Sequence, residues 1–274
     1  VGDNSQTNTT TGQWNTSIGT NSLTTNTTGS GNTALGNWAL KASTTSNYNT
    51  AVGQYSLQAN TTGIQNVAVG KDALDSNTTG SNNVALGVDA LQSNTIGAES
   101  VAIGTFALNA QNPASATNMY NVAVGHNSGA SVTTGVQNTA IGGLALDAAT
   151  TASNNTAIGM SALSGATTGG LNVALGRDAM KNSTTGSENV AIGAFALDAV
   201  TTQGAQTAVG YRALSDNTTG SANTAVGHES MFHNTTGSNN AAFGRLSLEN
   251  NTGDSNTALG SLTLRQNEGS NNTA

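Results

Sequence analysis

Three histidines and scattered carboxylates are the side chains of this chain that could support metal or acid–base chemistry. His228 is followed directly by Glu229, and His233 comes five residues after His228, so the His-Glu-x-x-His spacing of a zinc site is absent. His126 stands apart from both, and the chain contains no Gly-x-Ser-x-Gly or Walker motif. A catalytic site needs a few groups in unlike environments, and no such group stands out. The sequence therefore predicts no enzyme activity, no metal site and no cofactor.

The acidic residues follow a repeating pattern instead of forming one cluster. They occupy variable positions of a repeat described below, and no pair of carboxylates interrupts that repeat in a way that would suggest a glycosidase cleft. These acidic residues include Asp72, Asp75, Asp89, Asp147, Asp178, Glu188, Asp198, Asp216 and Glu229. We interpret their pairs with Lys or Arg as solvated surface pairs.

Seven aromatic residues are the candidate contacts for a ligand or receptor. Four lie two residues after a glycine that recurs along the chain, and three lie five residues before it. The first group is Trp38, Tyr55, Phe106 and Phe195, and the second is Trp14, Tyr48 and Tyr120. We expect Trp38 and Tyr55 to stack on neighbouring coils, near Trp14 and Tyr48. Exposed rings on a rigid scaffold can stack on sugar rings; the alternative is packing against a neighbouring chain or an overlying corner.

The recurrent glycine marks a repeat of 17 residues. Asn-Val-Ala-Val-Gly at 66–70 returns as Asn-Val-Ala-Leu-Gly at 83–87 and again at 172–176. Thirteen of the fifteen intervals between successive glycines are 17 residues, one is 21 and one is 16. These marker glycines are Gly2, Gly19, Gly36, Gly53, Gly70, Gly87, Gly104, Gly125, Gly142, Gly159, Gly176, Gly193, Gly210, Gly227, Gly244 and Gly260. Below, a row is the set of residues at one offset from the marker glycine, so row −2 lies two residues before it.

A repeat this short predicts an all-β parallel solenoid, or β-roll, of about 15 coils. Seventeen residues are too few for a helix pair, whereas two short strands and two turns fit. A second glycine stands in row +10 of many repeats, and we expect both glycines to provide the positive φ that corners need. The Asn of row −4 recurs in nearly every repeat, as at Asn49, Asn66 and Asn83, which predicts an amide ladder along the stack.

The repeat extends over residues 1–274 as a single array, interrupted once. The long interval contains the only proline, and it predicts a loop over residues 109–117. Both ends of the chain cut across a repeat, so we interpret the sequence as an excerpt of a longer fibre.

Alternation along the strand separates two faces. Row −1 is large and apolar, as at Ile158, whereas row −2 is almost always Ala, as at Ala157. We expect row −1 to fill the interior and the Ala stripe to be the surface through which chains associate. On this interpretation Ile158→Asp is far more damaging than Met160→Asp.

The composition excludes several classes of protein. Only 35% of residues are hydrophobic and 8% charged, proline occurs once and cysteine is absent, so neither an ordinary globule nor a charge-rich disordered chain is indicated. A net charge of −7 disfavours nucleic acid as a partner. The chain has no stretch of about 18 apolar residues, so no segment is predicted to insert into a membrane.

Two features of the repeat are the segment Asn-Thr-Ala-Val-Gly, present at 223–227, and the Ala-Leu pair that follows the marker glycine. Together they resemble the head repeats of trimeric autotransporter adhesins. They are also similar to repeats of phage tail fibres. The resemblance covers essentially the whole chain, although the adhesin repeat is shorter. It implies a left-handed β-roll, three chains around one axis and an adhesive or fibrous role.

Two functional hypotheses follow. The first is a structural and adhesive rod of a trimeric surface fibre or phage tail fibre, outside the cell or on a virion, with a surface glycan or protein receptor as partner. The alternative is a monomeric binding solenoid that recognises glycans or ice on one flat face.

Overall fold

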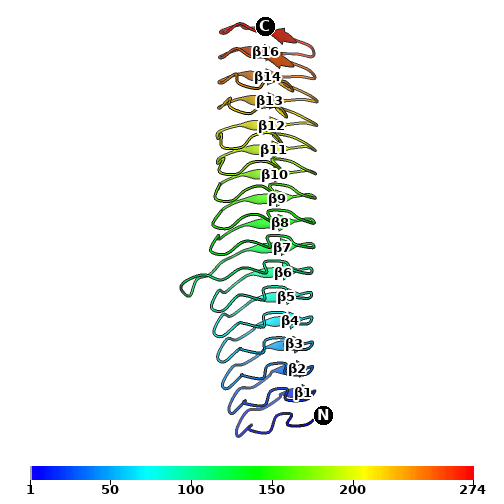
Figure 1. Cartoon of the computed structure of the whole chain (residues 1–274), viewed down its shortest axis with the longest axis vertical. Coiled ribbons are helices and arrows are strands. Elements are labelled where there is room, and N and C mark those ends of the chain that lie inside the picture. The colour runs from blue at the N-terminus through cyan, green and yellow to red at the C-terminus, as the bar shows by residue number, and fades with distance from the viewer. Residues whose placement is uncertain (1) are drawn as a thin grey trace. The chain divides into compact units, whose positions relative to one another are not determined.

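A computed structural model of the chain describes residues 2–274. The chain divides into two compact units, with the boundary between Gln137 and Asn138. Each unit is a parallel β-solenoid in which successive turns lie on one another, and the two together contain about 15 turns of about 17 residues (Figure 1). The predicted fold class and repeat are confirmed.

In the first unit each strand pairs in parallel with the next one along the chain. The pairing has no slip, so that Ala34 lies opposite Ala51 and Ala51 opposite Ala68. The strands of this unit are β1 (Thr16–Ile18), β2 (Thr33–Leu35), β3 (Thr50–Val52), β4 (Val67–Val69), β5 (Val84–Leu86), β6 (Val101–Ile103) and β7 (Val122–Val124).

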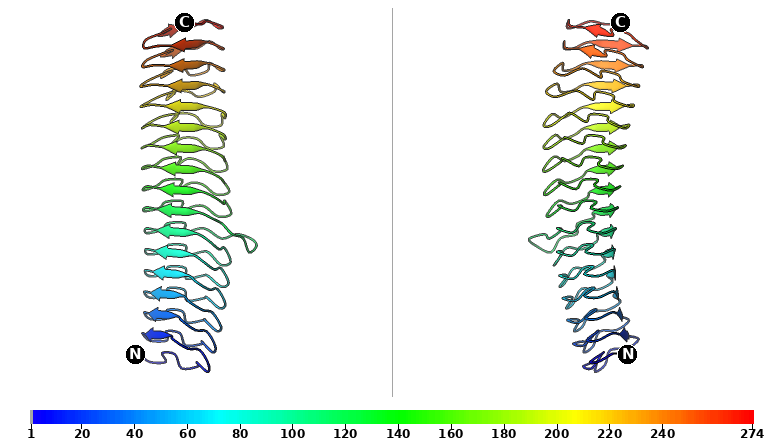
Figure 2. Two further views of the ribbon diagram at one scale, coloured as in Figure 1. Left: turned by 180° about the vertical axis from the view of Figure 1, so that it is seen from behind. Right: turned by 45° about the vertical axis from the view of Figure 1, so that its right-hand side comes forward.

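The second unit repeats the arrangement, and the strands of its main sheet all lie on one side of the stack (Figure 2). Its main sheet contains β8 (Thr139–Ile141), β9 (Thr156–Ile158), β10 (Val173–Leu175), β11 (Val190–Ile192), β12 (Thr207–Val209), β13 (Thr224–Val226), β14 (Ala241–Phe243) and β16 (Thr257–Leu259). A separate pair is formed by β15 (Asn250–Asn251) and β17 (Gln266–Asn267).

Most turns have one strand, whereas two were predicted. The apolar pair in rows +3 and +4, for which the second strand was expected, lies in a series of tight turns. In these turns every second residue has a left-handed backbone conformation. Row +4 has φ near +50° although it is Leu in most turns, as at Leu74 (φ 51°), and row +2 includes Trp38 (φ 65°) and Tyr55 (φ 61°). Such a conformation is unusual for bulky residues, and it prevents these residues from forming an extended strand.

The two glycines of the repeat have different roles. The marker glycines from Gly19 to Gly260 adopt φ between 128° and 147°, which an L side chain rarely tolerates, so the prediction for them is confirmed. The row +10 glycines do not share this conformation. At Gly63 a Cβ would lie 2.3 Å from the carbonyl oxygen of Gly80 in the next turn. Close approach of neighbouring turns therefore favours glycine in row +10, although Ser46, Ala152 and Gln203 also occupy this row, and the prediction of a positive φ there is wrong.

The interior is lined by alanine, which corrects the predicted orientation of the strands. In row −2, Ala51, Ala68 and Ala85 have no exposed area, whereas Leu86 of row −1 is 45% exposed. Row +3 Ala and row +4 Leu, such as Ala73 and Leu74, are fully buried. Each turn is narrow, and the Leu of the opposite wall already fills its volume, so a second large side chain from the strand would overpack it.

Two buried ladders of amides complete the interior, and the predicted row −4 ladder is confirmed. Asn66 donates from its backbone N–H (2.9 Å) and Nδ2 (3.2 Å) to Asn49 Oδ1, and its Nδ2 also donates to Gly80 O (2.9 Å). A second ladder in row +7 was not predicted; there Asn77 Nδ2 donates to Asn60 Oδ1 (2.8 Å). These bonds satisfy polar groups that burial would otherwise penalise.

The long repeat keeps its register on both sides of an outward loop. The N–H of Asn112 still bonds to Thr133 O in the next turn (2.9 Å), and a bridge between Ala98 and Asn118 restores the pattern. The chain between β6 and β7 projects away from the stack (Figure 1). The extra residues thus lie between Asn112 and Asn118, in the C-terminal part of the 109–117 segment.

Residues in and just after β9 test the orientation of the strands. Ala157→Asp places a charge in the closed interior and is expected to cost several kcal/mol. Met160→Asp changes an exposed residue outside the interior and outside the strand, and is expected to cost much less. Thermal melting by circular dichroism and limited proteolysis of both variants measure the difference. Equal destabilisation would contradict the buried position of row −2.

The amide ladder is tested by comparing Asn49→Ala with Asn37→Ala. Asn49 Nδ2 donates to Asn32 Oδ1, Ser46 Oγ and Gly63 O, and its Oδ1 accepts from Asn66, so its loss leaves buried partners unsatisfied. We expect Asn49→Ala to lower the free energy of unfolding by about 2 kcal/mol or more. Asn37 is exposed and serves as the control. Equal chemical-denaturation midpoints for the two variants would count against a stabilising ladder.

Candidate functional site

The described residues, 2–274, offer surfaces but no enclosed site. Within this range there is no pocket and no group of three His, Cys, Asp or Glu residues placed to hold a metal ion. The same residues contain no helix that is long and apolar enough to cross a membrane. Candidate sites are therefore exposed rows of side chains.

One exposed surface of each unit is the outer sheet face, defined as rows −3 and −1 of the strands. These two rows lie on either side of the buried Ala, so both point away from the interior. Its exposed large apolar residues are Ile18, Val67 and Leu86 in the first unit and Ile141, Val173, Leu175, Phe243 and Leu259 in the second. A row of exposed large apolar side chains of this kind marks an interaction site more often than single scattered ones do.

The row +2 aromatics contact rings of neighbouring turns. Trp38 and Tyr55 meet edge to face, with centroids 5.7 Å apart and planes at 88°. Phe106 lies against His126 at 6.3 Å, and Phe195 meets Tyr211 edge to face at 6.1 Å. The expected contact between Trp38 and Tyr55 is therefore present.

The row −5 aromatics are separate from those of row +2. Trp14 is 79% exposed, Tyr48 61% and Tyr120 49%. The ring of Tyr48 leans over Gly31, where a Cβ would lie 2.7 Å from Tyr48 Cδ1. Within residues 2–274 neither Trp14 nor Tyr48 makes a ring contact with Trp38 or Tyr55, so the expected four-ring cluster does not form.

Cations on aromatic faces were not predicted from the sequence. Lys41 Nζ lies 3.8 Å from the centroid of the Trp38 ring. Arg177 and Arg212 lie over Phe195, with guanidinium carbons 4.6 Å and 5.8 Å from its centroid. Three of the seven Lys and Arg residues of the chain thus lie on aromatic rings, a placement that the shared offsets of the rings do not predict.

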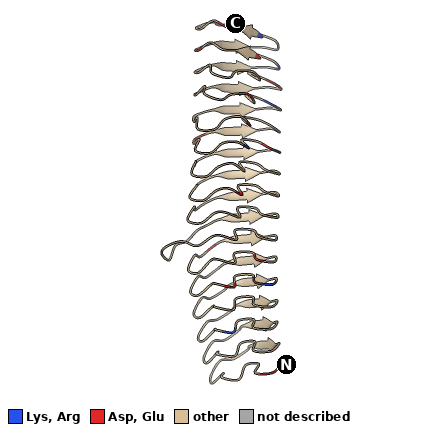
Figure 3. Ribbon diagram, viewed as in Figure 1, with Lys and Arg blue, Asp and Glu red and all other residues tan. Residues whose placement is uncertain are grey.

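The histidines form isolated pairs with carboxylates. His233 Nδ1 lies 2.6 Å from Asp216 Oδ2, and His228 Nδ1 lies 3.4 Å from Glu229 Oε2. Acidic and basic residues are distributed thinly along both units (Figure 3). In the part of the chain that the structure describes, neither pair belongs to a group of three His, Cys, Asp or Glu residues that could hold a metal ion.

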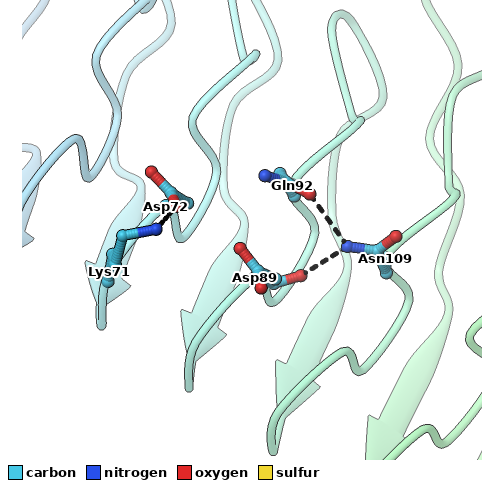
Figure 4. A network of polar contacts seen from close by, with 5 residues as sticks. All are labelled: Lys71, Asp72, Asp89, Gln92 and Asn109. Carbon is cyan, nitrogen blue, oxygen red and sulfur yellow. Dashed lines mark hydrogen bonds and ion pairs between the residues drawn. The ribbon is translucent and has the colours of Figure 1, made fainter.

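One polar network joins side chains of successive turns in the first unit (Figure 4). Lys71 pairs with Asp72, while Asn109 Nδ2 donates to Asp89 O (3.0 Å) and Gln92 Oε1 (3.2 Å). The bonds of Asn109 therefore tie adjacent turns of the stack to each other.

Three row +5 carboxylates are held in partly buried positions. Burial raises the pKa of Asp75, Asp147 and Asp198 above the ordinary value of 3.8. The charge of Asp72 raises the pKa of Asp75 further, whereas a hydrogen bond from Ser215 opposes the rise at Asp198. Their charged forms are therefore less favourable in the folded chain than in water.

Comparison with protein-family models and with curated proteins finds no match for this chain.

The row +5 carboxylates predict how stability responds to pH. Because their folded pKa lies above the unfolded value, the folded chain binds more protons, and stability rises as the pH falls through the folded pKa toward 3.8. The triple variant Asp75→Asn, Asp147→Asn, Asp198→Asn removes this gain. On going from pH 7 to pH 4.5, we expect the melting temperature of the wild type to rise more, or to fall less, than that of the variant. An unchanged pH profile would rule out the effect of burial.

Proposed function

We propose that this chain is a structural and adhesive rod of a surface fibre or phage tail fibre, in which three copies associate side by side through the outer sheet face. The number of copies, the left-handed coil and the fibrous role rest on the resemblance of the repeat to adhesin heads and tail fibres. The place of association rests on the exposed apolar rows. The interior is closed by Ala and Leu, so the large residues of row −1 remain for a partner.

A second copy of the chain is the partner that fits this surface best. The outer sheet face repeats the same pair of side chains once per turn, at the spacing of parallel strands, about 4.7–4.9 Å. Only a surface with the same period can match every turn, and this chain has one. Closed symmetric association of identical chains is also the usual way in which soluble proteins assemble.

The outer sheet face of each unit is comparable in extent to a protein–protein interface. Each three-residue strand presents two outward side chains, which makes 14 in the first unit and 16 in the second. A standard protein–protein interface uses about 20–30 residues on each side. Each unit by itself therefore offers most of the smallest number in that range.

The regular outer sheet face also favours one alternative, a monomeric solenoid that binds ice. Row −3 is Thr in eight strands, so methyl and hydroxyl groups recur on the outer sheet face beside the apolar side chains of row −1. Those threonines are Thr16, Thr33, Thr50, Thr139, Thr156, Thr207, Thr224 and Thr257. The corner threonines do not support this alternative, because hydroxyls such as Thr61 Oγ1 donate to the next turn, here to Thr78 O (3.1 Å).

The mass of the assembly in solution tests the proposal. Analytical ultracentrifugation of the wild type is expected to give three chains. The double variant Leu175→Asp, Ile192→Asp is expected to give a folded monomer, because two charges per chain would be buried at the interface. Met160→Asp, at an exposed row +1 position, is the control and should stay trimeric. A monomeric wild type would overturn the proposal, and thermal hysteresis in that monomer would support ice binding.

A further inference from the structure

Three successive turns of the second unit bring aromatic and cationic side chains into contact. We define the aromatic–cationic ridge as Phe195, Tyr211, Arg212, His228 and Phe232. Tyr211 meets Phe195 edge to face, and its ring centroid lies 5.2 Å from that of His228 at an angle of 30°. Tyr211 and His228 are exposed and the others are partly exposed. These contacts form a ladder of rings along the outside of the stack.

Arg212 lies among three of these rings. Its guanidinium carbon is 5.3 Å from the centroid of Phe232, 5.6 Å from that of Tyr211 and 5.8 Å from that of Phe195. Contact with aromatic faces holds a guanidinium group in place, while its N–H groups, which lie in the plane of the guanidinium, stay available as donors. Arg212 is thus positioned without using its donors.

The neighbouring carboxylates have other partners. Asp178 pairs with Arg177 and Lys181, and Asp216 and Glu229 pair with His233 and His228. Asp198, whose pKa responds to the charge of Arg212, accepts a hydrogen bond from Ser215 Oγ at 2.6 Å instead. No carboxylate of residues 2–274 lies within salt-bridge distance of Arg212, although the chain has 14 acidic residues and only seven Lys and Arg.

The same combination occurs independently in the first unit. Trp38 and Tyr55 form an edge-to-face pair, and Lys41 lies over Trp38. Lys41, like Arg212, has no carboxylate partner within the described part of the chain. Two separate aromatic pairs therefore each hold a cation that no acidic side chain neutralises.

We propose that the aromatic–cationic ridge binds an acidic glycan, with the C–H face of a sugar ring on Tyr211 and the sugar carboxylate on the guanidinium of Arg212. This proposal rests on the adhesive role proposed above and specifies its ligand class. A guanidinium pairs with a carboxylate through two parallel hydrogen bonds. The rings supply the apolar face that a pyranose stacks on, and their succession along the turns suits a linear chain of sugars.

The form and charge of the surface favour a glycan over a nucleic acid. The described residues contain no pocket for an isolated small molecule, so the ligand lies along an open ridge. A net charge of −7 opposes a phosphate backbone, which needs several cations in succession, whereas a sugar carboxylate whose ring stacks on Tyr211 needs only the guanidinium of Arg212.

The test measures binding of oligogalacturonate to the full chain by isothermal titration calorimetry at about 0.15 M salt. The fully methyl-esterified oligomer keeps the rings and removes the charge. We expect the wild type to bind the acid, and Arg212→Gln to lower that affinity about tenfold, as expected for the loss of a charge-assisted hydrogen bond. Tyr211→Ala is expected to weaken binding of both oligomers.

Arg245→Gln is the matched control, because Arg245 is a surface arginine of the same unit with no aromatic or acidic partner among residues 2–274. It should bind as the wild type does. Equal losses in the two arginine variants, tighter binding of a single-stranded oligothymidylate than of the acid, or no binding of either oligogalacturonate form would each overturn the ridge as an acidic-glycan site.

The outer-face variant Leu175→Asp, Ile192→Asp separates this proposal from the assembly of the fibre. Binding of oligogalacturonate by the monomeric variant supports the ridge whatever the outcome for association. A trimeric wild type that binds no acidic glycan leaves the fibre proposal intact and removes only the ridge.

Discussion

Every feature of this solenoid depends on hydrogen bonding between equivalent residues of successive turns. The N–H of Gly70 bonds to Val52 O and that of Val67 to Asn83 O, both at 2.8 Å, so each strand is held by the turns on either side of it. This spacing forces equivalent side chains into rows. A chain with 35% hydrophobic residues can then fold, because amide rows and backbone bonds supply the order that a wide apolar core supplies elsewhere.

The sequence was sufficient for the repeat, the fold class and the row −4 ladder because all three depend only on spacing. It was insufficient for the orientation of the strands. The alternation of side chains shows that rows −1 and −2 face opposite sides, but it does not say which row faces inward. The large size of the row −1 residues suggested that they fill the interior, and this inference was wrong. The Leu of row +4 fills the turn from the opposite wall, and it does so from a left-handed backbone, as at Leu74, that no propensity of leucine predicts.

The candidate site was predictable to the same extent. A shared offset brought Trp38 and Tyr55 together correctly, since neighbouring turns place equal offsets side by side. The cations were missed because Lys41 comes from row +5 and reaches a row +2 ring through its own side-chain torsions. Contacts between different rows depend on the path of the chain around the turn, which spacing alone does not describe.

The loop between Asn112 and Asn118 shows where this architecture accommodates change. The backbone bonds of Asn112 and Met119 continue the register on both sides, so the added residues leave the rows undisturbed. A corner of the turn is therefore a position at which evolution, or a protein engineer, can graft a peptide of new sequence and length. The hydrogen-bonded rows then stay the same from one variant of the fold to another. Changes in sequence and length are confined to a corner whose residues make none of the bonds between rows.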